Sequence, residues 1–401
     1  MFLFLKLELL VGLSYLWNMF PKKLQDKIKE REAQNMLRKL GTEHLLIDFS
    51  SNDYLGFSKL KEIFDMTYHY LETYNLTRNG ATGSRLLSGN YELYNEVEKT
   101  LCEFHQAESA LIFNSGYDAN LGFFSSVPQR GDIILYDEYI HASIRDGIGM
   151  SHANAYKFNH NDLEDLKQLI SRHSKHVSGS KQEIYIVTES VFSMDGDTPD
   201  ITSLINISKK HQAYLVIDEA HAIGVFGKNG EGLLQELGLE NEVFARIITF
   251  GKALGSHGAA ILGSKALTQY LINFARPFIY TTALPPHSVM TLKSVYIELP
   301  KTHEISKLKE NISLFKQEIL KNTLQNHFIE SQSAIQSCLI LGNENVKAIS
   351  NQLIKKGYDV KPILSPTVPK GMERLRFCLH SFNSEKEIKE VIHLLDKLLN
   401  I

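Results

Sequence analysis

Short apolar runs alternate with amphipathic segments between residues 107 and 265. The segments Asp162 to His173 and Ile201 to His211 repeat apolar positions at helical spacing. Six runs have strand length and end in polar residues: SALIFNSG, DIILYDE, EIYIVTES, AYLVIDEAH, ARIITFGK and GAAILGS. Apolar strands separated by helices are typical of a mostly parallel sheet covered on both faces. Functional side chains are expected where those strands end.

The pattern changes after Pro285 and Pro286, where a long helical region begins. Weaker strand-like runs, SCLILG and RLRFCLH, follow it, and a helical segment closes the chain. We therefore expect an α/β protein with a large central domain over residues 66–285 and a smaller α+β domain over 286–401. An N-terminal helix and arm are expected over 19–65, after a non-native or disordered extension over 1–18.

The first 18 residues are apolar but contain Lys6 and Glu8. They lack the basic region and cleavage site of a signal peptide, and they are too interrupted for a good spanning helix. Met19 precedes a polar helix start with Pro21 near its first turn. We expect translation to begin at Met19, and a peripheral membrane helix is the alternative.

The composition excludes several classes of function. The chain of 401 residues is 43% hydrophobic with a net charge of -3, which fits a globular protein without the basic excess of nucleic-acid binders. Its three cysteines, Cys102, Cys338 and Cys378, form no Cys-x-x-Cys pair. We therefore expect reduced thiols in a cytoplasmic protein, with neither a disulfide framework nor a metal site.

The residues Asp218 to His221 spell DEAH, which is also a helicase signature. A helicase needs a phosphate-binding G-x-x-x-x-G-K-[ST] motif before its acidic strand, and this chain has none. Gly251 and Lys252 are followed by Ala253 and come after the DEAH sequence. No G-x-G-x-x-G opens the first strand-helix unit, so a dinucleotide fold is excluded as well.

The strand ends suit pyridoxal 5'-phosphate (PLP) instead. Lys252, in a turn of small residues, can form a Schiff base, and Asp218 can keep the pyridine nitrogen protonated so that the ring accepts electrons. Ser115, Gly116 and Tyr117 open a helix whose backbone N–H groups can bind the phosphate. His141 follows another of the strand-like runs.

These motifs resemble those of the α-oxoamine synthases, a PLP-dependent family of fold type I that joins an amino acid to an acyl thioester. The resemblance runs from about Leu24 to the C-terminus. It is carried by FSSNDYLGFS, GATGSRLLSGN, FNSGYDAN, DEYIHASIRDG, TESVFSMDGD, VIDEAHAIGVFG, TFGKALGSHGAAILGS and FARPFIYTTALPP. SNDYLGFS, VFSMDGD and FARPFIYTTALPP are most similar to the biotin-pathway branch. That branch condenses L-alanine with a pimeloyl thioester, giving 8-amino-7-oxononanoate, CO2 and a free thiol.

The resemblance implies a role for each matching residue around the cofactor ring. Lys252 would hold PLP and take the α-proton of the substrate, while Asp218 would bind the pyridinium nitrogen. His221 and Ser193 would contact the ring hydroxyl. His141 would stack on the ring and reach the substrate.

Other matching residues would bind the phosphate and the two substrates. Phosphate contacts are implied for Ser115, Gly116, Tyr117 and Thr249, and for Thr281 or Thr282 from the second subunit of a homodimer. Arg376 would grip the carboxylate of the amino acid, although Arg374 points the same way on the predicted strand. Arg38 would meet the distal carboxylate of the acyl chain.

Ala81, Thr82 and Asn90 depart from the family pattern near the substrate channel, which leaves the acyl specificity open. Coenzyme A and acyl carrier protein both remain possible carriers. Alternatives within the family are 2-amino-3-ketobutyrate CoA ligase, 5-aminolevulinate synthase and serine palmitoyltransferase activities. A non-catalytic scaffold is opposed by the joint presence of Lys252 and its partner residues. No nucleic-acid partner and no stable membrane association are expected.

Overall fold

The computed structural model describes residues 20–34, 36–38, 40, 45–174 and 182–400, in two units that comprise residues 1–45 and 46–401. The first unit contains the helix α2 (Lys22–Ala33), which has no buried residue. The extension expected over residues 1–18 lies outside the described residues, and so does Met19. The expectation about the start of translation therefore stays a prediction.

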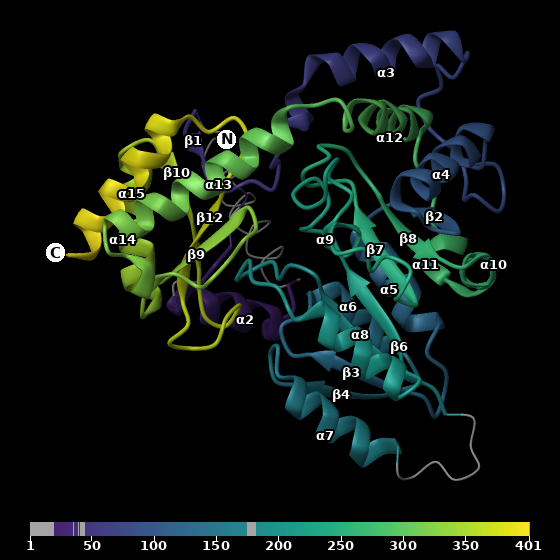
Figure 1. Cartoon of the computed structure of the whole chain (residues 1–401), viewed down its shortest axis with the longest axis horizontal. Coiled ribbons are helices and arrows are strands. Elements are labelled where there is room, and N and C mark those ends of the chain that lie inside the picture. The colour runs from purple at the N-terminus through teal and green to yellow at the C-terminus, as the bar shows by residue number, and fades with distance from the viewer. Residues whose placement is uncertain (1–19, 35, 39, 41–44, 175–181, 401) are drawn as a thin grey trace, which may run out of the picture. The chain divides into compact units, whose positions relative to one another are not determined.

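The second unit contains a seven-stranded sheet in the order β2-β8-β7-β6-β5-β3-β4 (Figure 1). The strands β3 to β7 run parallel to one another, whereas β8 is antiparallel to both β2 and β7. Their bounds are β2 (Ser109–Phe113), β3 (Ile133–Asp137), β4 (Asn154–Phe158), β5 (Ile184–Glu189), β6 (Tyr214–Asp218), β7 (Ala245–Thr249) and β8 (Ala259–Gly263). The prediction of a mostly parallel sheet with flanking helices is confirmed.

Successive residues of the central strands enter two different apolar cores. In β6, Leu215 and Ile217 belong to one core with Leu204 of α8, whereas Val216 belongs to the other with Phe123 of α5. This alternation explains the continuous apolar runs, because a strand buried on both faces has no polar side. The helices over the sheet are α5 (Gly116–Ser126), α6 (Ala142–Met150), α7 (Leu163–Ser174), α8 (Ile201–Lys210) and α10 (Lys265–Phe274).

Other helices of this unit come before and after the strands of the large sheet in the sequence. The helix α12 (Pro286–Glu298) packs against α3 (Lys61–Thr73) and α4 (Glu92–His105). The remaining short helices are η1 (Phe57–Lys59), α9 (Leu233–Glu236), α11 (Arg276–Ile279) and η2 (Gln325–His327). No helix within the described ranges combines the length and the apolar character that crossing a bilayer requires.

The C-terminal region contains a three-stranded antiparallel sheet in the order β11-β12-β9. Its strands are β9 (Ile335–Leu339), β11 (Lys361–Ile363) and β12 (Arg374–Cys378), with α13 (Glu304–Lys321), α14 (Asn343–Lys355) and α15 (Glu385–Leu399) beside them (Figure 1). The strand β1 (Ile47–Asp48) pairs in parallel with β10 (Tyr358–Asp359), so the predicted N-terminal arm joins this region. The predicted domain boundaries stay predictions.

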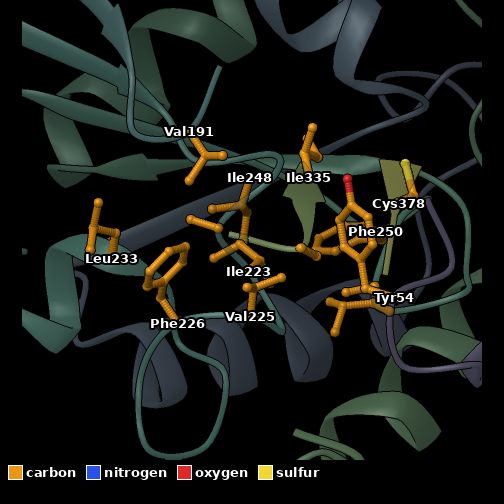
Figure 2. Packing of buried hydrophobic residues seen from close by; sticks show 14 of the residues in the cluster. Tyr54, Val191, Ile223, Val225, Phe226, Leu233, Ile248, Phe250, Ile335 and Cys378 are labelled. Atoms are coloured by element: carbon orange, nitrogen blue, oxygen red, sulfur yellow. The ribbon is translucent and has the colours of Figure 1, made fainter. Parts of the chain in front are cut away.

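One apolar core is shared by the two sheets. Figure 2 shows Tyr54 and Phe250, which follows β7, near Ile335 of β9 and Cys378 of β12, and all four belong to one buried cluster. Burial of this cluster fixes the C-terminal sheet against the strand ends of the large sheet. The residues that follow β5, β6 and β7 therefore face residues from β12 and from the arm.

Candidate active site

A cavity of about 270 Å³ lies at the carboxyl ends of β5, β6 and β7. The last residue of each strand lines it, namely Glu189, Asp218 and Thr249. The other lining residues are Asn52, Ser115, Gly116, Tyr117, Asn120, His141, Ser143, Ala220, His221, Gly251, Lys252, His257 and Gly258. A cavity at this edge of the sheet is where the parallel strand pattern predicts function.

Asp218 provides a buried carboxylate in the wall of the cavity. Its Oδ1 accepts a hydrogen bond from the backbone N–H of Ala220 (2.8 Å), and its Oδ2 accepts one from Nδ2 of Asn120 (2.9 Å). These two hydrogen bonds hold the carboxylate in place. Glu219 does not line the cavity, because its carboxylate pairs with Arg246 at 2.8 Å. The two acids of DEAH thus have separate roles.

Lys252 follows β7 by three residues and brings its amine to the same cavity. Burial lowers the pKa of Lys252 to about 8, although the negative charges of Asp218 and Glu189 oppose that shift. A lysine with a pKa near the working pH holds an appreciable fraction of neutral amine. Such an amine can attack a carbonyl carbon and can accept a proton.

His221 is buried, and its Nδ1 lies 2.7 Å from the hydroxyl of Tyr54. Burial and the positive charges of Lys252 and Arg376 keep the pKa of His221 well below its usual value, so the ring is neutral. The Tyr54 hydroxyl is also within 3.2 Å of Oδ1 of Asn52, which accepts from Nη2 of Arg376 at 3.0 Å. A chain of polar contacts thus leads from Arg376 to the histidine.

His141 begins α6 and is oriented by two contacts. Its backbone N–H donates to Oε1 of Glu189 (2.5 Å), and its Nδ1 lies 2.7 Å from Oγ of Ser143. Partial desolvation of the ring lowers the pKa of His141. Burial and the nearby Asp218 raise the pKa of Glu189 well above its usual value.

The N-terminus of α5 borders the cavity opposite the end of β7. Oγ of Ser115 caps the helix by accepting from the N–H of Asp118 (3.1 Å), as expected for a serine at this position. A Cβ on Gly116 would lie only 2.5 Å from Cγ2 of Thr249, so only glycine fits without a shift. The Thr249 hydroxyl is buried without a hydrogen-bond partner among the described residues.

These residues fit PLP at both ends of the molecule. The free N–H groups of α5 and the unpartnered hydroxyl of Thr249 suit a phosphate. Asp218 suits a protonated pyridine nitrogen, and Lys252 suits the aldehyde carbon. The donors required by the cofactor therefore line one cavity, where Ser115, Gly116, Tyr117 and Thr249 would bind the phosphate.

Arg374 and Arg376 have different surroundings, although both lie on one face of β12. Arg374 is fully buried and forms an ion pair with Asp195. Arg376 donates from Nε to the carbonyl oxygen of Ser193 (2.7 Å) and from Nη2 to Asn52, which lines the cavity. The geometry favours Arg376 as the residue that meets a substrate carboxylate, with Arg374 engaged in structure.

Some predicted site residues do not line the cavity of this chain. Ser193 is half-buried and contributes its carbonyl oxygen to Arg376. Thr281 and Thr282 both accept hydrogen bonds from Nδ2 of Asn114, at 3.4 Å to the Thr281 hydroxyl and 2.5 Å to the Thr282 carbonyl. Arg38 is exposed within the first unit. The binding roles of these four residues stay predictions, and so does that of Arg376, which does not line the cavity either.

Four residues of this network are not among the predicted site residues: Asn52, Tyr54, Asn120 and Glu189. Glu189 could have been found, because it ends the apolar run EIYIVTES as Asp218 ends its own run. Asn52 and Tyr54 lie in SNDYLGFS, a stretch without strand or helix periodicity. Their partners in the site, His221 for Tyr54 and Arg376 for Asn52, are 167 and 324 residues away, so no local pattern indicates their roles.

Comparison with known proteins agrees with this geometry. The family described as aminotransferase class I and II matches residues 45–395. An 8-amino-7-oxononanoate synthase of Emericella nidulans is 38% identical over 387 residues, covering 92% of this chain and 94% of the relative.

Two solved structures are similar over most of their length. The 8-amino-7-oxononanoate synthase of Francisella tularensis matches with a TM-score of 0.73 and 29% identity, covering 88% of this chain and 98% of the other. The serine palmitoyltransferase of S. paucimobilis, solved as a variant with a bound PLP–myriocin adduct, matches with a TM-score of 0.84 and 25% identity, covering 94% and 97%. The predicted cofactor is thereby confirmed as PLP. The chain belongs to the class I and II aminotransferase family, and within it to the α-oxoamine synthases, with most similarity to the 8-amino-7-oxononanoate synthases.

Proposed function

We propose that this protein condenses L-alanine with a pimeloyl thioester, releasing CO2 and a thiol and forming 8-amino-7-oxononanoate for biotin synthesis. The observation that carries the proposal is the 38% identity to an 8-amino-7-oxononanoate synthase over 92% of the chain. It is supported by a cavity that brings together Lys252, Asp218, His141 and His221. We infer an acyltransferase that acts in the cytoplasm.

PLP, when bound, supplies a positively charged ring that withdraws electrons from the α-carbon of the amino acid. The carboxylate of Asp218 holds the proton on the ring nitrogen, and Asn120 keeps that carboxylate in position. His221 and Ser193 are the candidates for the ring hydroxyl. Lys252 would hold the cofactor through its aldehyde carbon, and its neutral amine would take the α-proton of the amino acid.

The amino acid is held by Arg376, which contacts the cavity residue Asn52, and by His141. The guanidinium of Arg376 binds the α-carboxylate, and Asn52 fixes the direction of that guanidinium. His141, which lines the cavity, would stack on the cofactor ring and orient the carbonyl of the thioester. Holding both reactants in one geometry removes much of the entropic barrier to their reaction.

The bonds in the overall reaction balance. The α-carbon of alanine loses its proton to Lys252 and bonds to the thioester carbonyl carbon. The carbon–sulfur bond breaks, and the thiolate leaves and takes a proton from solvent. The bond to the former alanine carboxylate then breaks to release CO2, and Lys252 returns a proton to the α-carbon. No oxidant or metal is needed.

The same proposal includes the binding of the acyl group and the oligomeric state of the protein. Arg38 binds the distal carboxylate of the pimeloyl group, and Ala81, Thr82 and Asn90 adjust the acyl channel. The acyl carrier is coenzyme A or an acyl carrier protein. The protein acts as a homodimer in which Thr281 or Thr282 of the second subunit reaches the phosphate.

Serine palmitoyltransferase activity is the second candidate. It is favoured by one observation, the TM-score of 0.84 to the enzyme from S. paucimobilis against 0.73 to the synthase from F. tularensis. The identities reverse that preference, since the curated relative at 38% is a synthase of the biotin type. We therefore rank it below condensation with alanine.

Thiol release by the PLP-loaded protein tests the proposal. Pimeloyl, succinyl, acetyl and palmitoyl thioesters are each combined with L-alanine, glycine or L-serine, and Lys252→Ala is the inactive control. Release confined to alanine with the pimeloyl thioester supports the biotin role, and serine with palmitoyl supports the second candidate. Arg38→Gln is compared with Arg31→Gln, an exposed arginine of α2. A selective rise in the pimeloyl KM for Arg38→Gln supports its role.

A further inference from the structure

The turn from Ser193 to Asp197 connects the large sheet with the C-terminal sheet. It follows β5, and four of its residues bind the C-terminal region. The contacts are Ser193 O with Nε of Arg376 (2.7 Å), Met194 O with Oγ of Ser337 (2.7 Å), Asp195 with Arg374, and Gly196 O with Oγ of Ser331 (2.8 Å) and Ser333 (2.9 Å). The position of Arg376 therefore depends on the position of this turn.

His160 holds the other side of the same turn. Its Nδ1 lies 2.9 Å from Oδ1 of Asp137, the last residue of β3, and its Nε2 lies 2.9 Å from Oδ2 of Asp197. Tyr139 stacks on the imidazole at 4.4 Å, and Phe192 meets it edge-on at 4.5 Å. The ring is thus fixed in the one orientation that lets both nitrogens face carboxylates.

The groups around His160 favour its charged form. Asp137 is fully buried, and Asp195 also lies nearby but is paired with Arg374. Glu138 accepts from the backbone N–H of His160 at 3.4 Å and pairs with Lys157. Burial lowers the pKa of His160, but the hydrogen bonds to Asp137 and Asp197 outweigh it and raise the pKa to about 9. The side chain is therefore an imidazolium near neutral pH.

We propose that His160 is a positioning residue for amino-acid binding, because it fastens the turn that holds Arg376. The imidazolium joins Asp197 of the turn to Asp137 of β3, and the Ser193 carbonyl then holds the guanidinium of Arg376 toward Asn52. The inference rests on the proposed function in one respect, the role of Arg376 as the carboxylate-binding residue.

A metal ion is the competing explanation for the same residues. Ligand atoms of His160, Asp195 and Asp197 lie within 4.8 Å of one another. Both nitrogens of His160 already face carboxylates, however, and Asp195 is engaged by Arg374. A cationic imidazole needs no metal to neutralise these acids. The observed partners therefore favour an imidazolium that joins Asp137 to Asp197.

The test compares His160→Gln and Asp197→Asn with the wild type and with His327→Gln, an exposed histidine of η2. The dissociation constant of L-alanine is measured from the absorbance change of bound PLP, without any thioester. Loss of a charge-assisted hydrogen bond should weaken alanine binding about tenfold in His160→Gln, with a smaller change in kcat at saturating alanine. His327→Gln should match the wild type.

The pH dependence separates positioning from a general structural role. The contribution of protonated His160 to alanine affinity is fully present near neutral pH. It is lost as the pH rises through the pKa of His160, about 9. The ratio of the alanine dissociation constants of His160→Gln and wild type should therefore fall from about ten at pH 7.5 toward one at pH 10. Lys252 and alanine itself titrate equally in both proteins, so they cancel in the ratio.

Several outcomes would overturn the inference. These are an unchanged alanine affinity in both folded variants, a ratio that does not vary with pH, or a stoichiometric metal whose removal reproduces the variants' effect. PLP content and melting temperature check folding, and Asp197→Asn, which keeps the shape of its side chain, serves if His160→Gln does not fold. Alanine binding without thiol release from pimeloyl thioester would overturn the proposed function and leave this inference intact.

Discussion

The hydroxyl of Tyr54 lies 2.7 Å from Nδ1 of His221, and both side chains are buried. The same hydroxyl is 3.2 Å from Oδ1 of Asn52, a partner of Arg376. A hydroxyl has one proton, so it can donate to only one of these two acceptors at a time. The tautomer of His221 is therefore coupled to the hydrogen bonding of the residue that faces Arg376.

Tyr54→Phe should lower kcat/KM for alanine about five- to tenfold, because a buried hydrogen bond is lost and His221 is left without its partner. The absorbance spectrum of bound PLP should shift as well, since the histidine is no longer held in one tautomer. Tyr185→Phe is the matched control, as Tyr185 is buried in the other apolar core. Equal kinetics and spectra for both variants would contradict the coupling.

Asp218→Asn should reduce kcat about a hundredfold or more, because an amide cannot keep the pyridine nitrogen protonated. The side chain keeps its size, so folding and PLP content should change little. Steady-state kinetics and absorbance measure the two effects. Asp200→Asn is the control, since asparagine also caps helices and Asp200 caps α8 outside the site. Retention of most activity in Asp218→Asn would refute the assigned role.

Gly116→Ala should weaken PLP binding about tenfold, because the new Cβ would lie 2.5 Å from Cγ2 of Thr249. Thr249→Ser removes that methyl group and keeps the hydroxyl. Gly116→Ala combined with Thr249→Ser should therefore recover much of the lost affinity. Equilibrium dialysis of PLP against the four proteins gives the coupling between the two positions. Independent, additive effects would show that the close approach is not the cause.

Capture of PLP by the apoprotein should accelerate about tenfold between pH 7 and 9, because the pKa of Lys252 is about 8 and only the neutral amine attacks the aldehyde. Borohydride reduction and mass spectrometry locate the modified lysine. Lys252→Ala should capture nothing, and Lys265→Ala should behave as wild type. A rate that keeps rising to pH 10 would place the pKa of Lys252 near that of an ordinary lysine.

Substitutions of the two arginines of β12 should affect different properties of the protein. Arg374→Met should lower the free energy of unfolding by about 3–5 kcal/mol, because Asp195 would be left buried without its partner. Arg376→Lys should instead raise the KM for alanine about tenfold, because lysine cannot make the bidentate contact. Urea denaturation and steady-state kinetics measure the two. The assignment is reversed if Arg374→Met raises KM selectively.

The large sheet could be predicted because its central strands are buried on both faces. That burial makes β5, β6 and β7 continuous apolar runs, and the polar residue that ends each run becomes visible. The strand β4 was not predicted, since four of its five residues are exposed at the sheet edge and no apolar run marks them. The pair β1 and β10 was missed because each strand has two residues and pairing joins Ile47 to Tyr358.

The site was predicted where chemistry and strand ends coincide, as at Asp218, His221, His141 and Lys252. Asn52, Asn120 and Tyr54 could not be predicted in the same way. Their roles arise from tertiary contacts alone, and neutral polar side chains have many other uses in loops. A residue that acts through a distant neighbour shows no characteristic spacing in the sequence.

The last residue along the chain that lines the cavity is Gly258, whereas Arg376 lies in β12 near the end of the chain. A ribosome adds about 5–20 residues per second, so the arginine is made roughly 6 to 24 s after the last residue of the cofactor wall. A message truncated between the codons of Gly258 and Arg376 encodes every residue that lines the cavity but not the arginine. Such a chain would contain the residues proposed to bind PLP and would lack the arginine proposed to bind the amino acid.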